Sequence, residues 1–223
     1  MPASGAVTRN TLRQQIADAL RDEVLAGRMR PGEEFTVKQI AEQYGVSATP
    51  VREALVDLCA QGLLDSDQHR GFRVRVFTVE DYKGIVEARA LVVDGIFRRA
   101  ALPGNFEAQG PALVSVRRRG EEAARAARGG DLNILVGYDL RFWRELCALA
   151  GNTYISDFLH RLRMQSWVFA VPHLRGHSDL SDWLWTGHDE VVSALALGDF
   201  EAARVLIGAY NEESLVWAER LPR

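Results

Sequence analysis

The 223-residue sequence has only two cysteines, Cys59 and Cys147, and they form no CxxC unit. A disulfide framework or a zinc ribbon needs more cysteines at closer spacing, so neither is expected. The sequence also lacks an apolar run of the roughly 18 residues that a membrane helix requires, and its first ten residues lack the apolar centre of a secretory signal. We therefore expect a cytoplasmic protein with no membrane partner.

Short motifs of several common enzyme classes are missing as well. The sequence contains no GxSxG, no Walker-type phosphate loop and no GxGxxG, so it offers no nucleophile elbow and no nucleotide cradle. Low-complexity tracts are absent, and 47% hydrophobic with 26% charged residues is typical of a folded globular protein. A chain of this length can bury a core in each of two domains.

Excess charge of one sign is also lacking. The net charge is −3, which argues against a protein that coats nucleic acid through clustered lysine and arginine. Residues 1–77 contain ten Lys or Arg and ten Asp or Glu. Any contact of residues 1–77 with a nucleic acid must therefore depend on where a few basic residues lie, and not on the overall charge.

Three helices and a hairpin are predicted in the first 77 residues. Apolar residues at helical spacing predict a helix over 11–27. Thr36 and Gln39 form a capping-box pattern that starts a short second helix, and Gly45 ends it. Ser47 is a good N-cap for a third helix that reaches Gly62. A polar, glycine-containing centre between residues 63–64 and the alternating segment 72–76 predicts a β-hairpin.

Strand patterns end near residue 78, where we place the domain boundary, so that the two domains are 1–77 and 78–223. Amphipathic helical patterns follow at 79–101, 106–128, 132–150, 153–170, 181–197 and 200–220. We place breaks between them at Gly and Pro positions, including Pro172. The expected fold is mostly α: a winged helix-turn-helix followed by an all-helical antiparallel bundle.

A set of short motifs spans about 65 residues of the N-terminal half: Pro31-Gly32, Ile40-Ala41, Gly45-Val46-Ser47-Ala48-Thr49-Pro50-Val51-Arg52-Glu53-Ala54-Leu55, Gly62-Leu63 and Arg70-Gly71. In these residues the chain resembles the GntR superfamily of bacterial operator-binding proteins. The resemblance implies a sequence-specific DNA-binding regulator, usually a repressor, that works as a homodimer on a palindrome. Relatives often carry arginine where this chain has Ala48, which removes one cationic DNA contact.

Seven residues are candidates for contact with double-stranded operator DNA. The start of the third helix is expected to be exposed, and Arg52 there can fork onto guanine O6 and N7. Lys38 is placed to reach a phosphate, and the hairpin tip to enter the minor groove, where glycine permits close approach. Outside this motif, an arginine such as Arg52 would more often be a solvated surface charge. A lone exposed histidine at a turn, such as His69, is as often without a role in DNA binding as with one. The full set is Lys38, Ser47, Thr49, Arg52, His69, Arg70 and Gly71.

A second set of short motifs covers most of 78–223: Glu87-Ala88-Arg89, Leu91, Asp139-Leu140-Arg141-Phe142, Gly151-Asn152, His188, Ala194, Gly198-Asp199 and Ala202-Ala203. In these residues the C-terminal half resembles the FCD domain of the fatty-acid-regulator-like branch of the same superfamily. The resemblance implies a domain that binds a small-molecule effector and dimerises.

Many FCD domains hold a divalent metal with one aspartate and three histidines, and this chain keeps only part of that set. Asp139 and His188 stand at two of the positions, whereas Trp143 and Tyr210 replace two histidines. Indole nitrogen has no lone pair for a metal and a neutral phenol is a poor ligand. We expect no cofactor and no dedicated metal site; a bound metal would need water or another residue such as His160 to complete its shell.

We expect instead a metal-free pocket for a small organic acid. Its residues would be Arg89, Asp139, Trp143, His188 and Tyr210, with Arg89 forking onto the carboxylate of the effector. Asp139 also has a purely structural interpretation, as the partner of a nearby arginine or histidine. The tryptophans at 167, 183 and 185 are best explained by core packing.

The leading hypothesis is a ligand-responsive, DNA-binding transcriptional regulator, and two alternatives differ from it in class. One is a DNA-binding dimer whose helical domain has lost ligand sensing. The other is an enzyme that uses Asp139 and His188 as an acid/base pair, for which the sequence supplies no nucleophile or oxyanion hole.

Overall fold

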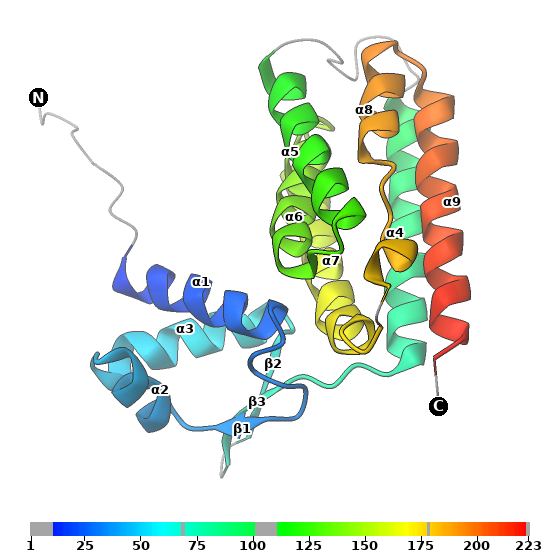
Figure 1. Cartoon of the computed structure of the whole chain (residues 1–223). Helices are drawn as coiled ribbons and strands as arrows, with labels where there is room; N and C mark the ends of the chain where they lie inside the picture. Colours follow the sequence, from blue (N-terminus) through cyan, green and yellow to red (C-terminus); the bar gives the residue numbers. More distant parts are fainter. Residues whose placement is uncertain (1–10, 68–69, 101–110, 178, 222–223) are drawn as a thin grey trace, which may run out of the picture. The chain divides into compact units, whose positions relative to one another are not determined.

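The computed structural model describes residues 11–67, 70–100, 111–177 and 179–221. The chain divides into two compact units, Met1–Val76 and Phe77–Arg223. Figure 1 shows that the first combines helices with a small sheet and that the second is built of helices. The predicted mostly α class is therefore confirmed.

The first unit has the element order of a winged helix. Its helices are α1 (Leu12–Leu25), α2 (Val37–Tyr44) and α3 (Ala48–Ala60), and its strands are β1 (Glu34–Phe35), β2 (Leu64–Asp67) and β3 (Gly71–Val74). The strands form one antiparallel sheet in the order β1-β3-β2. Strand β1 was not predicted, because two residues are too few to carry an alternating pattern.

Local signals explain where α2 begins and ends. Thr36 Oγ1 accepts from the Gln39 amide at 3.2 Å, while Gln39 Oε1 accepts from the Thr36 amide at 2.7 Å. This reciprocal pair is the predicted capping box. Gly45 ends the helix in the left-handed conformation, with φ +65°, where glycine has no steric penalty.

The core of the first unit joins α1 and α3 to the sheet. Helices α1 and α3 pack against each other. The apolar residues of α3 recur at helical spacing and are buried on one side of the helix. Burying these side chains supplies most of the stability of such a small unit. The fully buried residues of the core include Leu20, Val51, Leu55, Leu58, Leu63 and Val74.

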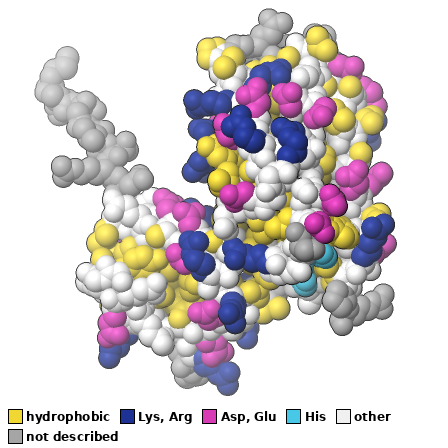
Figure 2. Space-filling model, in the orientation of Figure 1, with side chains coloured by type: hydrophobic (Ala, Val, Ile, Leu, Met, Phe, Trp, Pro, Cys, Tyr) yellow, Lys and Arg dark blue, Asp and Glu magenta, His cyan; other side chains and the backbone are white. Residues whose placement is uncertain are grey.

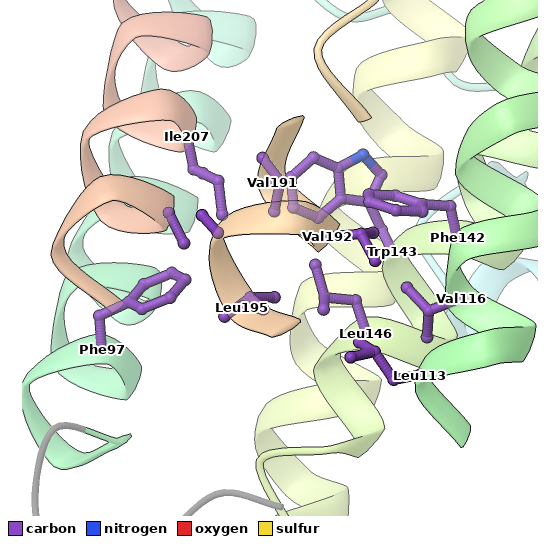
Figure 3. Packing of buried hydrophobic residues seen from close by; sticks show 12 residues of the cluster. Phe97, Leu113, Val116, Phe142, Trp143, Leu146, Val191, Val192, Leu195 and Ile207 are labelled. Atoms are coloured by element: carbon purple, nitrogen blue, oxygen red, sulfur yellow. The ribbon is translucent and has the colours of Figure 1, made fainter. Parts of the chain in front are cut away.

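The second unit is a bundle of six α-helices and one short 3-10 helix within the described residues. They are α4 (Val79–Ala100), α5 (Pro111–Arg128), α6 (Leu132–Ala148), α7 (Thr153–Leu174), η1 (Leu180–Trp183), α8 (His188–Ala196) and α9 (Phe200–Glu219). Helix α5 packs on α6 and α8, and α4 packs on α7 and α9. Figure 3 shows Phe142, from α6, and Val116, from α5, among the residues of the apolar core.

Two helix boundaries in the bundle were predicted wrongly. Helix α7 continues through Pro172 to Leu174; a proline this close to the C-terminal end costs little more than one backbone hydrogen bond. The expected helix 181–197 is divided into η1 and α8 by residues 184–187. The first residues of the helix expected at 106–128 lie outside the described residues.

No helix among the described residues combines the length and the apolar character needed to cross a membrane.

Candidate functional sites

The N-terminal turns of α3 present polar side chains on the exposed side of the first unit. Ser47, Thr49 and Arg52 are exposed, whereas Val51 and Leu55 on the same helix are fully buried. No ion pair involves Arg52 in the part of the chain that the structure describes. Its guanidinium is therefore available for a bidentate contact.

The other predicted DNA contacts lie on α2 and the hairpin. The Lys38 side chain is 84% exposed, and its Nζ lies 3.8 Å from Glu42 Oε1. Such an exposed pair is weak, so Lys38 can exchange it for a phosphate. Arg70 Nη1 lies 3.8 Å from Glu34 Oε1. His69 lies outside the described residues.

Gly71 is required by the geometry of the hairpin. Its φ is +97°, and a Cβ added there would lie 2.6 Å from the carbonyl oxygen of Phe35. Any other residue would be strained at this angle and would collide with the backbone of β1. Figure 2 shows acidic and basic side chains intermingled on the visible face of the first unit, in keeping with its neutral charge balance.

Asp139 lies at the centre of a buried polar cluster in the second unit. Its side chain is buried among α6, α7 and α8, and both of its oxygens accept hydrogen bonds. Trp143 Nε1 donates to Oδ1 at 2.9 Å and Trp167 Nε1 donates to Oδ2 at 2.7 Å. His188 Nε2 lies 3.1 Å from Oδ1 and donates, because a carboxylate can only accept.

Arg163, from α7, supplies the positive charge of this cluster and was missed by the sequence interpretation. Its side chain is only 3% exposed. Its Nε lies 3.9 Å from Asp139 Oδ2, and its Nη1 donates to the Tyr210 hydroxyl at 2.7 Å. Its guanidinium carbon also lies 4.2 Å from the centre of the Trp143 ring, a cation–π contact.

The sequence did hold a signal for Arg163. Residues Leu159, Arg163, Ser166, Trp167 and Ala170 are buried and fall on one face of α7. A charged residue on a buried and mostly apolar helix face indicates a buried partner of opposite charge. Asp139 thus has both a nearby arginine and a nearby histidine as partners, while its role toward an effector stays a prediction.

The cluster holds Asp139 in its charged form. Burial alone raises the pKa of this carboxyl, but the Arg163 charge and the hydrogen bonds from His188 and Trp167 outweigh it and lower the pKa to about 2. Arg163 remains a cation as well: burial disfavours its charge, yet Tyr210 and Asp139 more than offset this and its pKa is raised.

A cavity of about 160 Å³ lies beside the cluster. Polar groups from the cluster and aromatic rings share its wall, and acidic side chains from η1 and α9 add to it. The residues that line it include Asp139, Arg163, His188 and Tyr210, the aromatic residues Tyr82, Trp167, Trp183, Trp185 and Trp217, and the acidic residues Asp182 and Glu213.

The structure separates the predicted effector residues into two groups. Asp139, His188 and Tyr210 line the large cavity, whereas Arg89 and Trp143 line a neighbouring space of only about 10 Å³. Arg89 donates two hydrogen bonds to Asn211 Oδ1, at 3.1 and 2.7 Å, so it is held within the bundle. Arg163, which lines both spaces, is the guanidinium that a molecule in the large cavity would meet.

The tryptophans predicted to be packing residues also take part in the cavity. Trp167 is buried and donates to Asp139, whereas Trp183 is 38% exposed, so core packing does not account for it. All three tryptophans at 167, 183 and 185 line the large cavity.

Comparison with known protein families assigns both units. Residues 12–74 match the bacterial regulatory proteins of the gntR family, and residues 84–212 match the FCD domain. The chain belongs to the GntR family. It is a DNA-binding transcriptional regulator and not an enzyme, which removes the acid/base alternative for Asp139 and His188.

Individual relatives agree with this assignment. The regulator is 31% identical over 200 residues to a Paenarthrobacter nicotinovorans protein named "Probable D-xylose utilization operon transcriptional repressor", covering 90% of this chain and 85% of the relative. Among solved structures, McbR/YncC of E. coli has a TM-score of 0.78 at 19% identity, covering 94% and 98% of the two chains. A GntR regulator from Rhodococcus sp. RHA1 has a TM-score of 0.73 at 25% identity, covering 95% and 99%.

The side chains of this GntR regulator do not fit the metal site that many FCD domains hold. A protein metal site needs three or four lone-pair ligands, and no group of three or more such His, Cys, Asp or Glu residues occurs in the described parts of the chain. Both oxygens of Asp139 already accept indole N–H bonds. His160, the residue considered to complete a shell, lines the small space rather than the large cavity.

Proposed function

We propose that this regulator is a cytoplasmic, homodimeric repressor that leaves its operator when a small carboxylate enters the 160 Å³ cavity. Residues 1–77 form the DNA-binding domain, and residues 78–223 bind the effector and dimerise. The observation that carries the proposal is the buried guanidinium of Arg163 at the wall of that cavity, in a bundle whose described residues bury two arginines and one carboxylate.

Among the described residues, three side chains with a full charge are buried. They are Arg89 and Arg163, each 3% exposed, and Asp139, 2% exposed. Two guanidinium groups therefore share one carboxylate, and Arg89 Nη1 is buried without a hydrogen-bond partner. A buried charge that lacks a counter-charge costs free energy. A carboxylate bound against Arg163 would supply the missing negative charge.

Arg163, rather than Arg89, is the proposed anchor for the effector. Its guanidinium borders the cavity and matches a carboxylate in planar geometry. Tyr210 and His188 border the same space and offer further polar contacts, while the tryptophan rings would cover the apolar part of the ligand. This separates the proposal from a dimer that has lost ligand sensing, which would need neither the cavity nor its charge.

The DNA contacts follow the exposed residues of the first unit. Arg52 would read a guanine, with Ser47 and Thr49 beside it on phosphates or base edges. Lys38, Arg70 and Gly71, with His69, would contact the flanking backbone and minor groove. Repression is supported by the name of the Paenarthrobacter relative. Release requires that the effector bind the operator-competent and incompetent arrangements with different affinity.

Two measurements on the full chain test the proposal. Selection from random DNA fragments should enrich one palindromic sequence, and sedimentation should give a dimer on it; enrichment of no sequence would contradict the DNA-binding part. A thermal-shift series with acetate, succinate, benzoate and gluconate should then raise the melting temperature for one class of acid. No shift with any acid, alongside normal operator binding, would support the constitutive dimer instead.

A further inference from the structure

Arg163 meets three of the four positions at which FCD domains carry metal ligands. It pairs with Asp139, lies over the ring of Trp143 and donates to Tyr210. The fourth residue, His188, is hydrogen-bonded to the same carboxylate. We infer that the guanidinium of Arg163 takes the place of the divalent cation in this chain and excludes that cation from the site. The inference is independent of the proposed effector.

The two replaced histidines have become groups that suit a planar organic cation. The Trp143 ring centre lies 4.2 Å from the guanidinium carbon and the Tyr210 ring centre lies 5.2 Å from it. The two rings are nearly parallel, with an angle of 16° between them. Aromatic faces attract a guanidinium through their quadrupole, whereas they offer a divalent metal no lone pair.

The hydrogen bonds of the cluster also favour a guanidinium over a metal ion. A histidine ligand presents a lone pair to a metal, but the Trp143 indole presents an N–H to Asp139. The Tyr210 hydroxyl accepts from Arg163 at 2.7 Å. The two groups that stand in place of histidines are therefore committed, Trp143 to the carboxylate and Tyr210 to the guanidinium.

Electrostatics also separate the two cations. A metal bound to Asp139 would lie about 2 Å from a carboxylate oxygen, and Arg163 Nε lies 3.9 Å from Oδ2 of that carboxylate. The two like charges would then share one buried counter-ion, which is strongly unfavourable at low dielectric. Restoring the histidines alone should consequently leave the metal excluded, because Arg163 remains.

The test compares two variants of the full chain. Trp143→His with Tyr210→His, in one chain, restores the ligand set but keeps the guanidinium. Adding Arg163→Met removes the charge and keeps a shorter, unbranched apolar side chain, and adding Arg161→Met instead is the matched control, because Arg161 is exposed on the same helix. Each protein is dialysed against Zn²⁺ or Ni²⁺ alone, and its metal content and melting temperature are measured with and without chelator.

We expect metal near one equivalent, and a chelator-sensitive rise in melting temperature, only in the chain that carries Arg163→Met. The chain with both histidines and the Arg161→Met control should bind the ions at least tenfold more weakly. Equal binding with and without Arg163 would overturn the inference, as would a stoichiometric chelatable metal in the unmodified protein.

A second comparison covers the case in which the histidine variants fail to fold. In the unmodified background, Arg163→Met should lower the melting temperature of the helical unit, and Arg163→Lys should restore part of the loss, since it keeps the charge beside Asp139. Arg161→Met should leave it unchanged. If Arg163→Lys melts no higher than Arg163→Met, or if Arg163→Met melts with the control, the guanidinium is not acting as the cation of the site.

Discussion

The Trp143 indole contacts both members of the ion pair at the centre of the bundle. Its N–H donates to Asp139 Oδ1 at 2.9 Å, and its ring centre lies 4.2 Å from the guanidinium carbon of Arg163. One side chain therefore satisfies an acceptor on the anion and provides a π-face for the cation. These two contributions can be separated by substitution.

Trp143→Phe should keep an aromatic ring at this position and remove the donor, together with part of the buried ring volume. Leaving a buried carboxylate oxygen with one hydrogen bond fewer should reduce the free energy of unfolding by about 1–3 kcal/mol. Urea titration followed by fluorescence measures this for the helical unit alone, because all five tryptophans lie within residues 143–217. Trp183→Phe, at a 38% exposed position, is the control and should change little. A loss no larger than that of the control would mean that the indole donor is dispensable.

Arg52→Ala should abolish most of the discrimination between the operator and random DNA. A bidentate contact to one base contributes about 1–3 kcal/mol, which corresponds to roughly 5- to 150-fold in the affinity ratio. Binding titrations on the selected operator and on a scrambled duplex provide the measurement. Arg28→Ala, which removes an exposed arginine paired with Glu23 after α1, is the matched control. Preserved selectivity in Arg52→Ala would refute its assignment as a base reader.

Lys38→Ala should weaken binding to every DNA sequence by a similar factor. Its exposed ammonium, 3.8 Å from Glu42, is proposed to contact a phosphate. Losing one phosphate contact should lower the slope of log affinity against log salt by about one ion. The slope is measured on both duplexes from low to physiological salt. A loss confined to the operator would instead identify Lys38 as a base reader.

Acid should destabilise the helical unit through Asp139. The pKa of Asp139 falls from 3.8 to about 2 on folding, because Arg163 and the hydrogen bonds outweigh burial. A lowered folded-state pKa adds stability above the unfolded pKa, and this stability is lost as the pH falls from about 4 through 2. The unfolding free energy of the unmodified protein relative to Asp139→Asn should therefore fall by about 2 kcal/mol between pH 5 and pH 2. A difference that does not change with pH would show that the carboxylate is not preferentially charged in the folded state.

Local signals made much of the fold predictable, whereas the centre of the candidate site was not. Thr36, Gln39 and Gly45 determine the ends of α2 within ten residues of sequence, so the capping box could be identified directly. The partners of Arg163 are distant in the chain: Tyr210 lies 47 residues beyond it. Such a pairing depends on how the helices pack, which a single helical pattern does not specify.

Arg89 is a second residue whose role depends on a partner distant in the sequence. Its charge and its match to the family suggested an effector anchor, but its hydrogen-bond partner Asn211 lies 122 residues away, on α9. No local pattern around either residue indicates this pairing. Arg163 therefore replaces Arg89 as the proposed effector anchor, because packing places Arg163, and not Arg89, at the wall of the large cavity.

The most direct test of the account is operator affinity measured with and without the acid that raises the melting temperature most, in the presence of chelator throughout. The unmodified protein and Arg161→Met should both lose operator affinity when the acid is added, while Arg163→Met should bind the operator and fail to respond. The account would be contradicted if Arg163→Met responded to the acid as the unmodified protein does, or if the response required a divalent metal.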